Sequence, residues 1–264
     1  MTRRRLDAEL VRRGLAASRA EAQEAVRKGL VLVAGNVAAK PATMVGEDQP
    51  LGLAGPSRRF VSRGGEKLQA AVERFTLDPR GAKALDAGAS TGGFTDCLLQ
   101  AGAAHVVAVD VGYGQFDWAL RTDQRVTLLE RTNVRGLRPE QLAYRPDLVV
   151  VDLSFISLAV VLPALVAASQ QGATFVALVK PQFEAGPKDV GSGGVVREPE
   201  VWRRVLAQVL TAFDAAGVPG RALMASPLPG PAGNIEFLLL AGPGRDHPGV
   251  PDVDAAITEG LTLV

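Results

Sequence analysis

The sequence has few of the side chains that crosslink a chain or hold a metal. Its 264 residues include one cysteine, Cys97, and two histidines, His105 and His247. A single cysteine excludes an internal disulfide and a cysteine-rich zinc site, and it is typical of a reducing compartment. Two histidines argue against a histidine metal site. We therefore expect a cytoplasmic protein with no bound metal.

Long apolar runs are also missing. The most apolar helical stretch, residues 158–168, contains Pro163 and is too short to span a bilayer. The first ten residues, MTRRRLDAEL, include acids and lack an apolar centre, so we expect no signal peptide. Both observations argue against a membrane partner.

The net charge is small as well, at +1. Any nucleic-acid surface must therefore be a local patch rather than a property of the whole chain. Hydrophobic residues make up 47% of the sequence, which is enough for a sizeable core in one or two domains.

The most informative stretch that is present is ALDAGASTGGF, residues 84–94. Its apolar start, its glycine turn and the apolar residues 94–99 predict a strand, a tight loop and a helix N-terminus. Glycines permit close backbone approach, and the first amides of a helix favour electron-rich ligand groups. The next apolar run, 105–109, ends in Asp110, where an acidic residue suits hydrogen bonds to ribose hydroxyls.

This loop discriminates between cofactors. A dinucleotide site has the pattern G-x-G-x-x-G, whereas the chain reads D-x-G-x-S-T-G-G-F, with no basic residue between Asp86 and Phe94. Such a loop is a poor cradle for phosphate and a better site for a cofactor with an amino group, a sulfonium and a ribose. The pattern therefore favours S-adenosylmethionine, and a purely structural turn is the alternative.

From residue 82 onward, strand-like and helix-like segments alternate, which predicts an α/β fold with a mostly parallel sheet between helices. The last two strands are close enough to be antiparallel. The expected strands are 84–86, 105–109, 126–129, 147–151, 174–179, 221–226 and 235–240. The expected helices are 94–100, 116–121, 139–143, 158–168 and 199–215, followed by an exposed loop and a short terminal helix within 242–264.

The first 55 residues differ from the rest. Apolar spacing predicts helices over 6–13 and 19–28, the second of them opened by a Ser18–Glu21 capping box. The segment that follows, LVLVAGNVAAK, predicts a hairpin that turns at Gly35 and Asn36. Residues 1–28 also carry an excess of basic side chains, as a surface for phosphate backbones requires. The alternative is an ordinary solvated helix face.

The pattern R-L-D-x-x-L-V-R-R-G-L-A-x-S-R-x-x-A, with K-G-L-V-L-V-A-G-N-V after it, resembles the S4 RNA-binding domain. The resemblance implies a small α+β module over residues 1–55 that docks on folded RNA. A basic linker, 56–66, would then lead to a second domain, 67–264. We expect the following residues to bind RNA: Arg3, Arg4, Arg5, Arg12, Arg19, Lys28, Lys40, Arg58, Arg59 and Arg63.

Polar residues at strand ends are informative because ligands in open α/β sheets lie beyond the carboxyl ends of the strands. Asp152 ends the run DLVVVD, and Lys180 ends TFVALVK, where desolvation favours a neutral amine. Glu236 lies at the start of the last strand, and Lys67 lies on a helix before the sheet. Each of the four alone has an ordinary structural interpretation, as a cap or a strand-end charge.

Together, the order Lys, Asp, Lys, Glu resembles the tetrad of FtsJ-like RNA 2′-O-methyltransferases. With the S4-like module, the chain resembles the TlyA family of rRNA cytidine 2′-O-methyltransferases, some of which are labelled haemolysin A. LDAGASTGGF, DVGYGQ, DLSFISL, VKPQFE and SPLPGPAGN carry the match. The resemblance implies a Rossmann-like, seven-stranded methyltransferase domain that modifies cytidines in 16S or 23S rRNA, or in both, within ribosomal subunits.

The resemblance also implies the roles of the residues. Lys180 would deprotonate the ribose 2′-hydroxyl or act as its electrostatic partner, Lys67 would stabilise the oxyanion, and Asp152 and Glu236 would orient the two lysines. Which lysine takes the proton stays open. The expected S-adenosylmethionine site comprises Asp86, Gly88, Ala89, Ser90, Thr91, Gly92, Gly93, Phe94, Asp110, Val111 and Asn133.

Three other functions compete with this one. A nicotinamide-dependent oxidoreductase would share the sheet but not the glycine loop. A pore-forming protein would fit the haemolysin label but not the hydrophobicity. An S4-type RNA-binding protein with an inactive sheet would not need the complete tetrad. We expect a monomer that binds rRNA and not DNA. The sequence leaves open which nucleotide is modified. Residues Arg3–Arg5 and 242–264 resemble the extensions of the longer TlyA family members, which are associated with both ribosomal subunits.

Overall fold

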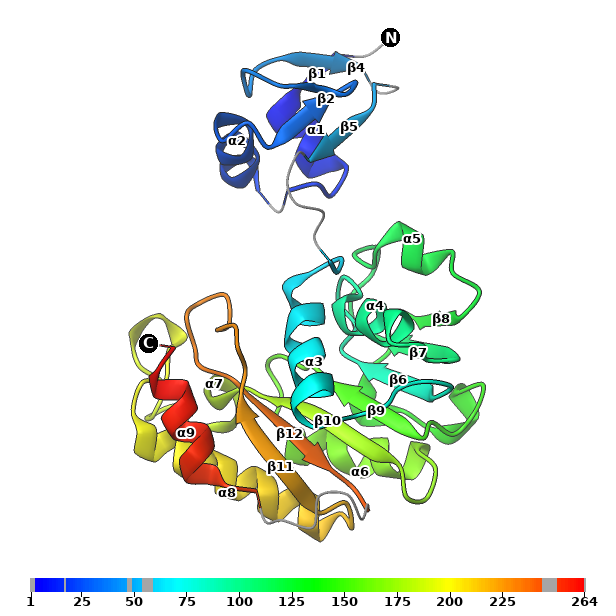
Figure 1. The fold of residues 1–264 in the computed structure, drawn as a ribbon, viewed down its shortest axis with the longest axis vertical. Coiled ribbons are helices and arrows are strands. Elements are labelled where there is room, and N and C mark those ends of the chain that lie inside the picture. The colour runs from blue at the N-terminus through cyan, green and yellow to red at the C-terminus, as the bar shows by residue number, and fades with distance from the viewer. Residues whose placement is uncertain (1–2, 17, 47–48, 54–58, 244–250, 264) are drawn as a thin grey trace. The chain divides into compact units, whose positions relative to one another are not determined.

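The computed structural model describes residues 3–16, 18–46, 49–53, 59–243 and 251–263. The chain divides into two compact units, Met1–Arg59 and Phe60–Val264, and Figure 1 shows the elements of each. Each unit has its own hydrophobic core.

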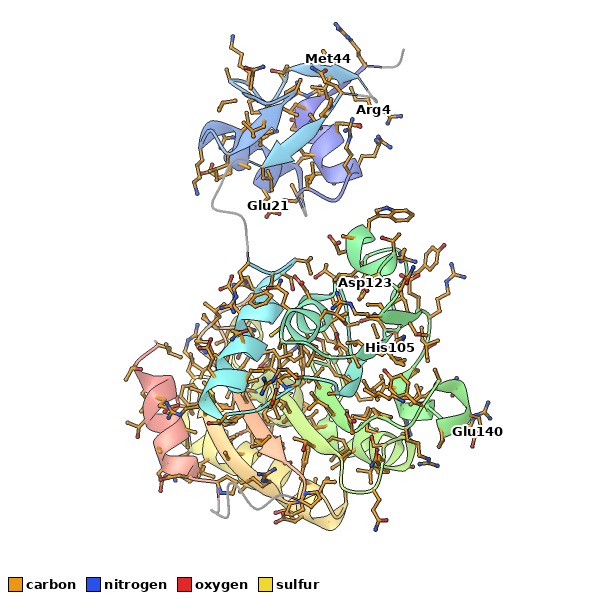
Figure 2. All side chains as sticks on the ribbon, turned by 45° about the vertical axis from the view of Figure 1, so that its right-hand side comes forward. Arg4, Glu21, Met44, His105, Asp123 and Glu140 are labelled. Atoms are coloured by element: carbon orange, nitrogen blue, oxygen red, sulfur yellow. The ribbon has the colours of Figure 1, made fainter. Side chains whose placement is uncertain are left out.

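The smaller unit packs two helices, α1 (Leu6–Arg12) and α2 (Arg19–Arg27), against short strands. As predicted, Ser18 caps α2 by accepting a hydrogen bond from the backbone N–H of Glu21 at 3.2 Å. Strand β2 (Val31–Val33) pairs with β3 (Asn36–Val37) and β5 (Leu51–Leu53). Strand β1 (Arg3–Arg5) pairs with β4 (Met44–Gly46), so that Arg4 and Met44 lie on neighbouring strands (Figure 2).

The hairpin turn of this unit lies one residue earlier than predicted. Ala34 and Gly35, and not Gly35 and Asn36, form the turn, with φ values of 50° and 82°. Two successive positive φ angles are the geometry that matches the twist of a two-residue hairpin. Asn36 then begins β3. The expectation failed because both Gly35 and Asn36 are residues that favour this turn.

The larger unit is built on one seven-stranded sheet with the order β11-β12-β10-β9-β6-β7-β8. Five strands are parallel: β6 (Lys83–Ala87), β7 (His105–Val109), β8 (Val126–Leu129), β9 (Leu148–Val151) and β10 (Thr174–Val179). Strand β12 (Phe237–Ala241) runs antiparallel to β10 and to β11 (Gly220–Ala225), as expected for the final pair. Every residue of the LVVV run in β9 is buried, as a strand covered on both faces requires.

Helices cover both faces of this sheet (Figure 1). On one face lie α3 (Arg63–Arg74), α4 (Gly93–Gln100) and α5 (Trp118–Arg121), around the core of Leu68, Leu98 and Val150. On the other lie α6 (Leu158–Ala168), α8 (Pro199–Ala215) and α9 (Val253–Leu261). A four-residue helix, α7 (Pro181–Glu184), follows β10 directly.

Three local expectations differ from the structure. The expected helix over 139–143 is a 3-10 helix, Pro139–Gln141, because Pro139 starts it and Leu142 returns to extended backbone. The expected helix over 116–121 begins only at Trp118, since the side chain of Asp117 caps it. Phe60 and residues 63–66, expected in the linker, lie in the larger unit, where Phe60 is buried in the core.

The terminal helix expected within 242–264 is α9, whereas the loop before it lies partly outside the described residues. Strands β7 and β8 extend the sheet on one side of β6, whereas the next strand, β9, pairs with β6 on its other side. The order of the strands therefore reverses between β6 and β9. The crevice beyond the carboxyl ends at such a switch point is where open α/β sheets bind ligands.

Candidate active site

The loop after β6 approaches the end of β9 so closely that only glycine fits at its first turn. Gly88 has a φ of 92°, and a Cβ built on it would sit 2.4 Å from the backbone oxygen of Asp152. An L-residue is disfavoured at that φ, and the clash is with backbone, which cannot move aside cheaply. The turn at Gly88 therefore brings the loop of residues 88–92 directly beside Asp152.

A pocket of about 450 Å³ opens at this edge of the sheet. Its walls combine acidic and polar residues with apolar ones, and the lining contains no lysine or arginine. The lining residues are Gly88, Ser90, Asp110, Val111, Gln115, Asn133, Val134, Asp152, Leu153, Ser154, Phe155, Ile156 and Val161. An acidic, partly apolar pocket fits a purine nucleoside that carries a positive charge, and it does not fit a pyrophosphate.

Asp110 is held in place by the glycine loop and by its own loop. Its Oδ2 accepts the backbone N–H of Ser90 at 2.8 Å, and its Oδ1 accepts the N–H of Gly112 at 2.6 Å and a hydrogen bond from Gln115 at 3.1 Å. A carboxylate fixed in this way is oriented before a ligand arrives, which lowers the entropic cost of binding. Of the expected cofactor residues, this pocket includes Gly88, Ser90, Asp110, Val111 and Asn133.

Asp86, expected to bind the cofactor, does not line the described pockets at this sheet edge. It is fully buried, and its Oδ2 accepts a hydrogen bond from Thr95 of α4 at 2.6 Å, while its Oδ1 has no hydrogen-bond partner. Burial raises the pKa of Asp86 to about 7, the hydrogen bond from Thr95 opposes that rise, and the charge of Asp152 adds to it. Asp86 lies inside β6, so the alternation of the strand turns its side chain toward α4.

A second pocket, of about 260 Å³, adjoins the first and shares Gly88, Ser90, Asp152 and Ser154 with it. All four residues of the expected tetrad line it: Lys67, Asp152, Lys180 and Glu236. The glycine-loop residues Ala89, Thr91, Gly93 and Phe94 line it too, whereas Gly92 lines neither pocket. The structure thus brings together four residues that are far apart in the sequence.

The tetrad forms two ion pairs. Lys67 Nζ lies 2.5 Å from Glu236 Oε2, and both side chains are almost fully buried. Lys180 Nζ lies 2.5 Å from Asp152 Oδ1, and these two side chains are more open, at 12% and 24% exposed. The Lys180–Asp152 contact lacks hydrogen-bond alignment, and Lys180 instead donates a hydrogen bond to Ser154 Oγ at 3.1 Å. Lys180 is therefore the more accessible lysine, with Ser154 as its aligned partner.

The position of each tetrad residue follows from the end of a strand or the face of a helix. Asp152 and Lys180 are the first residues after β9 and β10, and Glu236 is the last residue before the antiparallel β12. Parallel strands end at one edge, and an antiparallel neighbour begins there. Lys67 reaches the same edge from α3, which packs against α4 through Leu68 and Ala71.

Sequence reasoning did not assign a role to several residues of this edge. Ser154 and Phe155 lie two and three residues after Asp152, and Gln115 lies five residues after Asp110. Phe155 is 90% exposed with a φ of 65°, and its ring lies 4.9 Å from that of Phe183 between centroids. Their signal in the sequence was their place in the loops that follow two apolar strands. Arg63, expected to bind RNA, lines the pocket of the tetrad.

Several basic residues expected to bind RNA in the smaller unit lie beside acids, of which Asp7 and Glu9 are buried and Glu24 is exposed. Arg5 and Arg19 both bind Asp7, Arg12 binds Glu9, and Lys28 lies 3.5 Å from Glu24. Hydrogen bonds from Arg5 hold the pKa of Asp7 well below its usual range, and hydrogen bonds from Arg12 and Arg13 lower that of Glu9 to about 2.

These ion pairs fix the guanidinium groups without covering them. The side chains of Arg5, Arg12 and Arg19 stay 46%, 46% and 58% exposed. Arg3, Arg4, Lys40 and Arg59 are exposed as well, whereas Arg58 lies outside the described residues. A guanidinium has five donors, so one carboxylate leaves some of them for a phosphate.

Two further properties bear on the competing functions. Within the described residues, no helix has the length and apolar character needed to cross a bilayer. The same part of the chain contains no cluster of three or more His, Cys, Asp or Glu side chains arranged to hold a metal ion.

The seven-stranded sheet with its antiparallel final pair, and the acidic pocket at its carboxyl edge, define a Rossmann-like methyltransferase. The family model of the FtsJ-like methyltransferases matches residues 60–242, and that of the S4 domain matches residues 4–50. The chain therefore belongs to the FtsJ-like methyltransferases. A relative that is 52% identical over 98% of this chain places it, within them, in the TlyA family.

The relatives agree with this membership. The Mycobacterium tuberculosis protein named 16S/23S rRNA (cytidine-2′-O)-methyltransferase TlyA is 52% identical over 264 residues, which is 98% of each chain. Hemolysin A of Brachyspira hyodysenteriae is 35% identical over 235 residues, covering 89% of this chain and 98% of that one. A solved structure from Streptococcus thermophilus with a hemolysin name is 38% identical, with a TM-score of 0.76 and coverage of 100% and 97%.

Proposed function

We propose that this chain transfers a methyl group from S-adenosylmethionine to the ribose 2′-hydroxyl of cytidines in 16S and 23S rRNA, with ribosomal subunits as substrates. The observation that carries the proposal is the joining of two pockets at one sheet edge. Asp110 lines one pocket, the two lysine–carboxylate pairs line the other, and Asp152 and Ser154 line both. The name of the 52% identical relative supports the choice of substrate.

The residues of the larger pocket fit the methyl donor. Asp110 would accept hydrogen bonds from ribose hydroxyls, and the apolar side chains of Val111, Val134 and Ile156 would contact the purine. Asp152 would lie on the side of the positively charged sulfonium of the methyl donor. When bound, S-adenosylmethionine supplies a methyl group that its sulfonium already activates. The protein therefore has to position the hydroxyl, exclude water and accept a proton.

The four tetrad residues divide these tasks. Lys180 takes the proton of the 2′-hydroxyl, while Asp152 and Ser154 hold its nitrogen in place. Lys67 faces the oxygen as negative charge develops on it, and Glu236 holds Lys67. In this transfer the ribose 2′-oxygen would form a bond to the methyl carbon, and the bond between that carbon and the sulfur of the donor would break. The proton would move from the hydroxyl oxygen to Lys180 Nζ.

The smaller unit would supply affinity for RNA and no chemistry. It presents guanidinium groups that are fixed by Asp7 and Glu9 yet about half exposed. Such groups contact phosphates and give a binding constant that falls with salt concentration. We further propose a monomeric, cytoplasmic enzyme, with residues 60–66 belonging to the methyltransferase domain, where Phe60 packs into its core.

The test is methyl transfer to ribosomal subunits by the purified protein. 2′-O-methylation blocks alkaline cleavage of the adjacent phosphodiester, so the modified nucleotides can be mapped in the rRNA. We expect modified cytidines with the native protein and none with Lys180→Ala, while both bind S-adenosylmethionine equally in calorimetry. Methylation on a base, binding of NAD instead of S-adenosylmethionine, or full activity of Lys180→Ala would each contradict the proposal.

A further inference from the structure

The helix that carries Lys67 is held at two points by carboxylates from the last third of the chain. Lys67 of α3 pairs with Glu236, and Arg74 of the same helix pairs with Glu259 of α9. Residues seven positions apart lie on the same face of a helix. One stripe of α3 is therefore fixed both at its catalytic end and at its far end.

Glu259 makes this second contact around the free edge of the sheet. Strand β11 is the edge strand, and Glu259 Oε2 accepts the backbone N–H of Ala225 in that strand at 3.2 Å, while its other oxygen contacts Arg74. Helices α3 and α9 belong to the hydrophobic clusters on opposite faces. Figure 1 shows α9 alongside β11 and α8. Glu259 thus joins the two helical layers.

The same helix also supports Glu236, the partner of Lys67. Gly260 lies so close to the start of β12 that a Cβ there would sit 3.0 Å from Ile235 Cγ2 and 3.6 Å from the ring of Phe237. These are the two residues that flank Glu236. Ala256 and Ile257 of α9 are buried in the same cluster. Helix α9 therefore fixes the segment that carries Glu236, just before β12, relative to Glu259.

We propose that α9 positions Lys67 for catalysis and that Arg74 and Glu259 are the positioning pair. The inference rests on the proposed function, in which Lys67 faces the developing oxyanion. The pair itself is half exposed, at 59% and 36%, and an exposed ion pair adds little to stability. A small displacement of a catalytic group, in contrast, lowers the rate strongly. Removal of the Arg74–Glu259 pair should therefore lower the rate of methyl transfer and leave the free energy of unfolding nearly unchanged.

A matched control exists on the same helix. Asp254 of α9 pairs with Arg203 of α8 and does not bind α3. We would compare Glu259→Gln and Arg74→Gln with Asp254→Asn in single-turnover methyl transfer, at saturating S-adenosylmethionine and ribosomal subunits. The first two variants should be about tenfold slower, and Asp254→Asn should match the native protein. All three should bind S-adenosylmethionine with native stoichiometry, and Arg74→Lys should restore the rate.

A double-variant cycle separates positioning from general stability. In a Lys67→Met protein, which is itself impaired, adding Arg74→Gln should cause no further loss, because the group that Arg74 positions is gone. Equal rates for Arg74→Gln, Glu259→Gln and Asp254→Asn would overturn the inference. Additive losses of rate in the double-variant cycle would overturn it too. So would a fall in rate that merely matches a fall in the fraction of protein that binds S-adenosylmethionine. Absence of methylation by the native chain would instead overturn the proposed function.

Discussion

A Cβ placed on Gly88 would sit 2.4 Å from the backbone oxygen of Asp152. The glycine loop and the strand end that carries Asp152 are therefore in direct backbone contact. This contact places the expected cofactor loop beside the tetrad, since Gly88 and Asp152 line both pockets. The geometry of the site depends on this contact more than on any single polar side chain of the loop.

The first prediction concerns that contact. Gly88→Ala should lower the free energy of unfolding by more than about 1 kcal/mol, because it combines an unfavourable φ with a backbone clash. Gly81→Ala is the matched control, since Gly81 has a φ of 74° but open space around its Cβ position. Urea titrations followed by tryptophan fluorescence report the larger unit alone, because both tryptophans, Trp118 and Trp202, lie in it. Equal losses in the two variants would contradict the account.

The positions of the site residues relative to strand ends explain which of them the sequence predicted well. Asp110, Asp152 and Lys180 are each the first residue after a strand, so the strand's alternation does not dictate their direction, and they line the pockets. Asp86 is the second-last residue of β6, and the alternation turns it into the core. Apolar runs located the strands to within a residue or two, but a shift of one residue decides between pocket and core.

Other features could not be read from the sequence because they depend on tertiary contacts. The strands β1, β4 and β5 are three residues long, which is too short for apolar alternation to predict a strand. The partnership of Lys180 with Ser154 joins two strand-end loops, and only the sheet order brings these together. The pairing of Asp7 and Glu9 with the arginines of the smaller unit likewise depends on the fold, because the sequence shows these acids only as charges.

The second prediction concerns Asp110. Asp110→Ala should weaken the binding of S-adenosylmethionine by about 1–3 kcal/mol, because the oriented carboxylate no longer accepts the ribose hydroxyls. Asp214→Ala, an exposed position on α8, controls for the loss of one negative charge. Calorimetry would measure both affinities. Native affinity of the Asp110 variant would remove this residue from the cofactor site.

The third prediction concerns the pH dependence of stability. Burial raises the pKa of Asp86 from its ordinary value of 3.8 to about 7 in the folded protein. The folded state therefore holds this proton more tightly, and its contribution to stability is complete below about pH 4 and is lost as the pH rises through about 7. Asp86→Asn cannot ionise, so it should lose less stability than the native protein between pH 5 and pH 8. An identical loss in both proteins, measured by urea titration, would argue against the raised pKa.

The fourth prediction concerns Ser154. Ser154→Ala should slow single-turnover methyl transfer about tenfold, the equivalent of about 1.4 kcal/mol for the lost hydrogen bond to Lys180. Ser154→Thr keeps the hydroxyl and should retain most of the rate. Because Ser154 also lines the cofactor pocket, the rate must be compared at saturating S-adenosylmethionine. A native rate in Ser154→Ala would show that Asp152 alone holds Lys180.

The central claim is that Lys180 accepts the proton of a ribose 2′-hydroxyl, and Lys180→Arg tests it most directly. A guanidinium stays protonated and cannot accept a proton, although it keeps the positive charge beside Asp152. At saturating ribosomal subunits and S-adenosylmethionine, single-turnover methyl transfer should fall by about 10²–10⁴-fold, while calorimetry shows native cofactor binding. A rate close to that of the native protein would contradict the account, because Lys180 would then act only as a fixed charge.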